Sequence, residues 1–131
     1  MHMPWQSFLA EIQERGEFPG PEAAERAARV VLDLLGAHLV GQVRADLAAR
    51  LPETEARILL NPLEAREPLT PERFVRAAAA WLDSPSEKIA ARDVSAVLSV
   101  IADVAGEQLM PAILQQLPDG YDQLFGRLQL T

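Results

Sequence analysis

The residue types that most often carry out chemistry are scarce in this sequence. There are two histidines, His2 and His38, and no cysteine, which excludes disulfides, cysteine-ligated zinc and thiol nucleophiles. A metal site needs several ligands brought together, and a lone histidine without cysteines makes a poor one. We therefore expect His38 to be structural or solvent-facing, and we expect no metal site, no cofactor and no catalytic residue.

Carboxylates are abundant, but their spacing does not indicate a reactive centre. Asp103 and Glu107 are four residues apart, as are Glu22 and Arg26. A carboxylate-bridged iron or manganese site needs inward-facing glutamates on several helices, usually with a Glu-x-x-His motif, and the sequence has no such motif. We expect these groups to be solvated or ion-paired on helix surfaces.

The serines show no sign of a nucleophile. The sequence has neither a Gly-x-Ser-x-Gly elbow nor a glycine-rich phosphate loop. Ser95 and Ser99 are four residues apart and are expected on a helix surface. Ser84 precedes Pro85 and Glu87 in a pattern typical of a helix N-cap. The residues therefore give no indication of an enzyme.

Three large aromatic residues, Trp81, Tyr121 and Phe125, are the best candidates for contact with a partner. Tyr121 and Phe125 are four residues apart and so share one face of a helix. Tryptophan and tyrosine combine an apolar body with a polar tip, and aromatic residues are enriched at interface hot spots. We predict that the three form a patch used for self-association or for a protein partner. The alternative is that they seal an exposed end of the core.

Composition and charge predict the type of protein that carries these residues. The chain of 131 residues is rich in alanine and leucine, which favours helices. Nucleic acids and anionic membranes attract basic residues, and here 12 basic residues face 19 acidic ones, for a formal net charge of -7. No signal peptide and no apolar run of about 18 residues is visible. We expect a cytoplasmic, all-α protein that binds neither nucleic acid nor membrane.

One offset in the numbering, 66, relates the two halves of the sequence. Phe8 and Phe74 are 66 residues apart, and so are Leu51 and Leu117. Both leucines precede a proline. Most of the other matches at this offset are apolar. We predict two tandem four-helix repeats, residues 4–60 and 70–128, joined by a linker at 61–69. They are expected to pack into one compact helical bundle with pseudo-two-fold symmetry, as a single domain over 1–131.

Local signals place the helices of each repeat. The first helix begins near Pro4 and near Pro71, where Thr70 is a plausible N-cap, and the second begins near Pro21 and near Ser84. Third helices are expected at about 39–51 and 108–117, and fourth helices at 53–60 and 121–128. The second helices carry the apolar stripes that we expect to be buried: Ala24, Ala27, Ala28, Val31, Leu32, Leu35 and Ala90, Val94, Val97, Leu98, Ile101, Ala105.

The three aromatic residues of the predicted patch mark a difference between the repeats. At the same offset, the first repeat has Arg15, Glu55 and Leu59 at the positions of Trp81, Tyr121 and Phe125. A core that merely duplicates itself does not need this difference. The second repeat has therefore gained bulky side chains at three positions.

A family resemblance rests on motifs along nearly the whole chain. They are Phe8-Leu9, the Val-Leu at 31–32, the segment 46–52 that ends in Leu-Pro, and above all the segment 116–125, which runs QLPDGYDQLF. With these motifs the sequence resembles the bacterial family known as domain of unknown function 2267. The resemblance implies an all-helical repeated fold and a soluble bacterial protein, and it implies no activity. The sequence departs from the family pattern at 76–81 and at Leu39-Val40.

Two functions remain open. The first is a non-enzymatic module for protein–protein interaction or oligomerisation, which fits a duplicated helical scaffold without a catalytic motif. The alternative is a small-molecule-binding protein or an enzyme with a pocket between the two repeats, because ligand sites favour such junctions.

Overall fold

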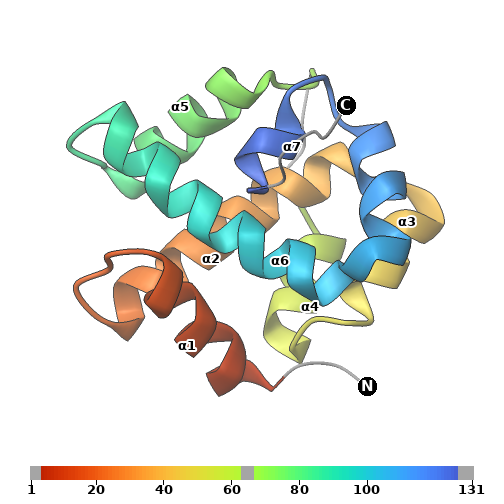
Figure 1. Ribbon diagram of the computed structural model, residues 1–131, viewed down its shortest axis with the longest axis horizontal. Helices are drawn as coiled ribbons and strands as arrows, with labels where there is room; N and C mark the ends of the chain where they lie inside the picture. The colour runs from red at the N-terminus through yellow and green to blue at the C-terminus, as the bar shows by residue number, and fades with distance from the viewer. Residues whose placement is uncertain (1–3, 63–66, 127–131) are drawn as a thin grey trace.

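The computed structural model describes residues 4–62 and 67–126, which form seven α-helices and no strand. The helices are α1 (Trp5–Arg15), α2 (Pro21–His38), α3 (Gly41–Ala48), α4 (Glu53–Leu60), α5 (Pro71–Leu82), α6 (Glu87–Gln116) and α7 (Tyr121–Leu124) (Figure 1). The predicted all-α fold class is confirmed.

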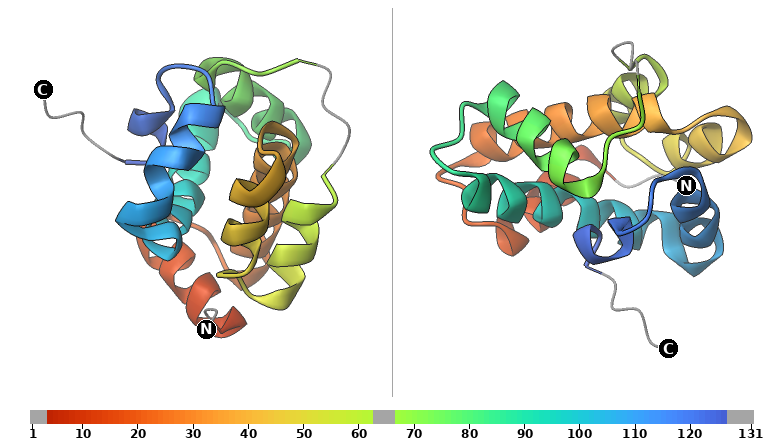
Figure 2. Two further views of the ribbon diagram at one scale, coloured as in Figure 1. Left: turned by 90° about the vertical axis from the view of Figure 1, so that its right-hand side faces the viewer. Right: turned by 90° about the horizontal axis from the view of Figure 1, so that it is seen from above.

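The two longest helices, α2 and α6, contact each other at the centre of the molecule. In Figure 1, α6 crosses in front of α2, with α5 above the crossing and α1 below it. Both α1 and α5 contact both central helices. The shorter helices gather at one end, where α3 and α4 lie opposite α7 and the last turns of α6 (Figure 2, left).

A continuous cluster of buried apolar side chains joins the helices. All twelve residues of the two predicted stripes on α2 and α6 are buried, as expected from their helical spacing. Phe8 of α1 and Phe74 of α5, which the offset between the halves relates, are both fully buried. Alanines make up much of both stripes, and short side chains let helix backbones pack closely.

The backbone of α4 closely approaches that of α2. A Cβ atom placed on Gly36 of α2 would lie 2.4 Å from the carbonyl oxygen of Leu59 in α4. Backbone atoms cannot easily move aside, so only glycine fits at this position. The end of α4 is therefore seated directly on the backbone of α2.

Two of the expected helix caps can be compared with the structure. The Thr70 hydroxyl accepts a hydrogen bond from the N–H of Arg73, as predicted. The cap of α6 is Ser86 rather than Ser84: its hydroxyl accepts from the N–H of Ile89, and the helix begins at Glu87. Ser84 and Ser86 each precede a residue suited to the first turn of a helix, and Ser86 is the one that caps α6.

The third helix expected in the second half is continuous with α6 rather than separated from it by a loop. The helix expected from about residue 108 is the part of α6 that follows a sharp kink at Gly106, whose φ of 75° and ψ of 173° are not helical, and it runs to Gln116 without an intervening loop. This positive φ favours glycine. Pro111 follows the kink closely and is accommodated in the helical segment after it. In the first half, the chain breaks after His38 and resumes at Gly41 as α3.

Helix α6 is long and apolar enough to cross a membrane by length and composition alone, with a mean hydropathy of 1.5 in its most apolar window. The central helix of a water-soluble protein satisfies the same criterion. Half of that window is buried inside the protein, against the other helices.

The central crossing gives a direct test of the core. Val31 of α2 and Leu98 of α6 are fully buried. Replacing either by aspartate places an unpaired charge in the core, which should cost about 3–5 kcal/mol. Because small domains have only about 5–15 kcal/mol of stability, we expect Val31→Asp and Leu98→Asp to melt far below the wild type by circular dichroism.

The matched control is Val40→Asp, the same kind of change at a valine that is 64% exposed. This variant should melt within a few degrees of the wild type. A buried variant that melts like the control would contradict the assignment of the core.

Candidate functional site

The three aromatic residues of the predicted contact patch do not lie together on the surface. Trp81, near the end of α5, is 62% exposed. Tyr121 and Phe125 are each 1% exposed and belong to the core cluster. Their prediction as partner contacts is corrected: the helix face that they share points inward. Of the three, only Trp81 is exposed.

Tyr121 instead fastens the chain where it enters α5. Its hydroxyl donates to the carbonyl oxygen of Leu69 at 2.7 Å. The backbone N–H of Leu69 donates in turn to Nε2 of His38 at 2.9 Å. Burial, together with the negative charge of Glu72, raises the pKa of the Tyr121 hydroxyl. The phenol therefore stays protonated, and both polar backbone groups of Leu69 are satisfied by side chains.

His38 has the structural role expected from the sequence. Its Nδ1–H donates to the carbonyl oxygen of Leu34 at 2.7 Å, so the acceptor for Leu69 is the unprotonated Nε2. The ring lies 5.9 Å from that of Phe74 and 6.3 Å from that of Tyr121. The last turn of α2, the start of α5 and α7 are thus held together by one cluster of rings.

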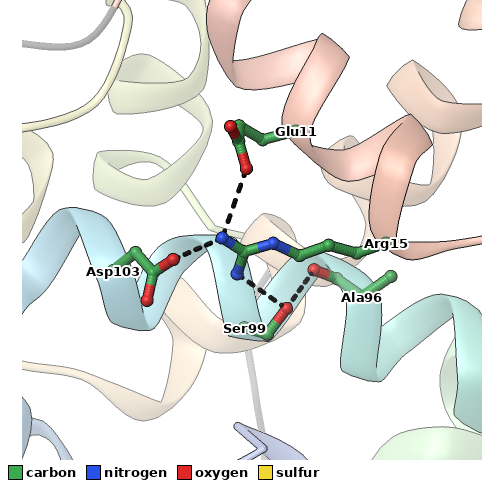
Figure 3. Close-up of polar contacts among 5 residues, drawn as sticks. All are labelled: Glu11, Arg15, Ala96, Ser99 and Asp103. Atoms are coloured by element: carbon green, nitrogen blue, oxygen red, sulfur yellow. Dashed lines mark hydrogen bonds and ion pairs between the residues drawn. The ribbon is translucent and has the colours of Figure 1, made fainter.

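A polar cluster joins α1 to α6 (Figure 3). The guanidinium of Arg15 donates to Oγ of Ser99 at 3.2 Å, to Glu11 at 3.2 Å and to Asp103. The hydrogen bond to Asp103 raises the pKa of Arg15. The sequence predicted that Asp103 would be either solvated or ion-paired, and it is ion-paired, with Arg15. The cluster carries both charges and a hydroxyl, yet each group already has a partner.

The two serines predicted on a helix surface are half-buried and hydrogen-bonded. Oγ of Ser95 donates to the carbonyl oxygen of Leu124 at 2.8 Å, which ties α7 to α6. Oγ of Ser99 donates to Ala96 at 2.9 Å within its own helix. Both hydroxyls thus donate to backbone carbonyl oxygens, not to a side chain that could act as a base.

A shallow open groove of about 530 Å³ lies beside the kink in α6. Its lining is formed by Arg50 and by the segment 103–108. Arg50 precedes α4 and donates from its guanidinium to the carbonyl oxygen of Ala105, the last residue before the kink. The groove therefore contains a guanidinium and the carboxylates of Asp103 and Glu107, with the amide of Gln108 beside them.

A second side chain braces the other helix break. Val40 lies between α2 and α3; its N–H donates to Oε1 of Gln116 at 2.9 Å, and its carbonyl oxygen accepts from Nε2 of Gln116 at 3.3 Å. Arg50 and Gln116 are related by the offset between the halves. Each half thus sends a side chain to the break that follows the long helix of the other half.

The most unusual group was not recognised from the sequence. Glu55 of α4 is fully buried, and neither carboxylate oxygen has a hydrogen-bond partner in the described chain. Burial raises its pKa to about 6; Glu25 adds to the effect, while the backbone N–H of Glu55 itself and the charge of Arg29 oppose it. The only signal was its place at the position equivalent to Tyr121, where the second half buries a phenol.

The described residues contain no group of three or more His, Cys, Asp or Glu side chains that could hold a metal ion. The carboxylates of the groove fall below that number, since only Asp103 and Glu107 line it. His2 lies outside the described residues.

The comparisons with known proteins agree with the motifs. A family model described as "Uncharacterized conserved protein (DUF2267)" matches residues 5–124. No curated protein matches the chain.

The role of Tyr121 can be tested by removing its hydroxyl alone. Tyr121→Phe leaves the ring in the core but removes the bond to Leu69, so we expect a loss of about 1 kcal/mol in the free energy of unfolding. Tyr121→Ala also removes the buried ring and should cost about 3–5 kcal/mol. Urea denaturation monitored by circular dichroism measures both. A Tyr121→Phe variant as stable as the wild type would show that the hydroxyl does not fasten Leu69.

Proposed function

Because the chain belongs to the family of uncharacterised conserved proteins DUF2267, which assigns no activity, we propose its function from its own surface: it is a non-enzymatic module for protein–protein interaction or oligomerisation. The observation that carries the proposal is the exposure of Trp81, which is 62%. Large aromatic residues are enriched at interface hot spots, where they become buried in a partner.

The proposal draws on a duplicated architecture. We propose that residues 4–60 and 70–128 are two copies of one four-helix unit, with the kink at Gly106 dividing α6 into the second and third helices of the second copy. The contacts support this division because they are reciprocal. α1 contacts α2 and crosses to α6, while α5 contacts α6 and crosses to α2. The braces made by Arg50 and Gln116 are exchanged in the same way.

Under this equivalence Trp81 occupies the position of Arg15 in the first unit. Arg15 is bonded to α6 through Ser99 and Asp103, so its side chain contributes to the fold. Trp81 leaves most of its ring in water at the corresponding place. An exposed indole contributes little to the stability of the isolated chain, and its burial by a partner would be favourable.

The environment favoured by this proposal is the cytoplasm. A chain with a formal net charge of -7 repels nucleic acids and anionic membrane surfaces. We further propose that α6 acts as a core helix rather than a membrane span, because it supplies the second face of the central crossing with α2.

A fluorescence experiment tests the interaction proposal on the intact chain. The sequence has two tryptophans, so Trp5→Phe leaves Trp81 as the sole indole. If the chain self-associates through Trp81, its emission should shift to the blue with rising protein concentration, in step with the mass from light scattering. Adding Trp81→Ala should weaken association by about thirtyfold while changing stability by less than about 0.5 kcal/mol.

If the partner is another protein, the chain stays monomeric and a photo-reactive residue at position 81 should crosslink to one protein in the native host. The same residue at Lys88, an exposed position that follows on the next helix, is the control. Equal crosslinking from both positions, together with a concentration-independent Trp81 spectrum, would contradict the proposal.

The groove beside Gly106 favours a second candidate function. It lies where Arg50 of the first unit meets the kink of the second, and it presents donors and acceptors to a small polar ligand. A ligand that binds the folded state raises the melting temperature. For this alternative, one member of a panel of polar metabolites should stabilise the wild type, and Glu107→Gln should abolish the effect.

The control for the groove is Glu67→Gln, which removes the same charge from an exposed residue outside it. This variant should respond to the ligand as the wild type does. A panel without any stabilising compound, or an equal loss in both variants, would remove the groove as a binding site.

A further inference from the structure

Glu55 is the only charged residue that is fully buried in the described part of the chain. It is the third residue of α4, where a glutamate commonly reaches back to the N–H of the cap residue. Here the cap residue is Pro52, which has no N–H. The sequence thus removes the usual partner, and both carboxylate oxygens remain without a hydrogen bond among the described residues.

The helices packed against α4 do not supply a countercharge. From α2, Glu25 and Arg29 act on Glu55 with opposite effects, and these two residues pair with each other at 3.5 Å. From α3, Arg44 donates to the carbonyl oxygen of Gly36, and Asp46 accepts from Gln42.

On α4 itself, Glu53 and Arg57 pair at 2.6 Å on the exposed side. An ionised Glu55 would therefore be a buried charge compensated only weakly, by its own backbone N–H and by an arginine already paired with Glu25, which protein interiors disfavour.

We propose that α4 is a proton-controlled flap, packed on α2 and α3 when Glu55 is protonated and loosened when Glu55 ionises. The response is local because α4 has only eight residues and a helix of that length is not stable alone. Besides Glu55, its only buried residue is Leu59. Ionisation of Glu55 therefore affects one of the two buried side chains that hold α4 against the other helices. Release would uncover the backbone of α2 at Gly36.

The second half provides an internal comparison. Tyr121 is the equivalent of Glu55 at the offset between the halves and is also buried, but its hydroxyl donates to Leu69 and stays protonated. Helix α7 therefore has no group that ionises in the physiological range at this position. At this pair of equivalent positions, α4 should therefore respond to pH and α7 should not.

The direction of the response follows from proton linkage. The packed state raises the pKa of Glu55 from 4.5 to about 6, so it binds the proton more tightly than the released state. Packing is thus strongest below pH 4.5 and weakens as pH rises through 6. This difference in the pKa of Glu55 between the two states changes the packing equilibrium of α4 by about thirtyfold between low and high pH. Between pH 5 and pH 7.5 the change is about tenfold.

Hydrogen exchange measured by mass spectrometry tests the flap on the full chain. After correction for intrinsic exchange with an unstructured peptide, we expect the protection of α4 amides to fall about tenfold from pH 5 to pH 7.5. Protection of α7 should stay constant. Glu55→Gln should remove the dependence, and Glu53→Gln, which neutralises an exposed neighbour on the same helix, should retain it.

Three results would overturn the inference: constant protection of α4, a loss of protection in all helices together, or the same pH response in Glu55→Gln. Should Glu55→Gln fail to fold, the carboxyl carbon of Glu55 in the wild type, followed by NMR, still decides. A midpoint near 6 supports the flap, and a midpoint near 4.5 refutes it. None of these readouts involves a partner, so they are independent of the interaction proposed for Trp81.

Discussion

Helices α2 and α6 can cross at the centre of the molecule because each presents a face of small and branched apolar residues. Their twelve stripe residues are buried, and nearly half of them are alanines. Every remaining helix is placed by this crossing. α1 and α5 each contact both members of the pair, α4 rests on α2, and α7 rests on α6. A helix as short as α4 or α7 is not stable in isolation, so its conformation depends on a central pair that is already packed.

The crossing also explains why the two halves need each other. Each long helix must be interrupted for the chain to turn back, and an interruption leaves backbone groups that need hydrogen-bond partners. Those partners come from the opposite half: Arg50 for the carbonyl of Ala105, and Gln116 for both polar groups of Val40. Separating the halves would expose apolar faces and also leave both breaks without their braces. These contacts thus join the two halves of the chain to each other.

The sequence predicted those features that depend on periodicity and local chemistry. The apolar stripes, the cap at Thr70 and the bounds of α4 follow from helical spacing and from proline or hydroxyl signals. It did not predict the direction in which a helix face points. Spacing places Tyr121 and Phe125 on one face, but only the tertiary packing turns that face inward. Residue type was equally uninformative for Glu55, since glutamates are rarely buried without a partner.

The differences between the halves are therefore more informative about function than their similarities. Leu59 and Phe125 differ in size, yet both are buried, so that pair reflects packing alone. Arg15 and Trp81 differ in kind: the arginine is bonded within the fold, whereas the indole is directed to water. Glu55 and Tyr121 also differ in kind, because only the carboxyl can change its charge near neutral pH. An exposed indole in one half and an ionisable anchor in the other are features that a partner or a change in pH can act upon.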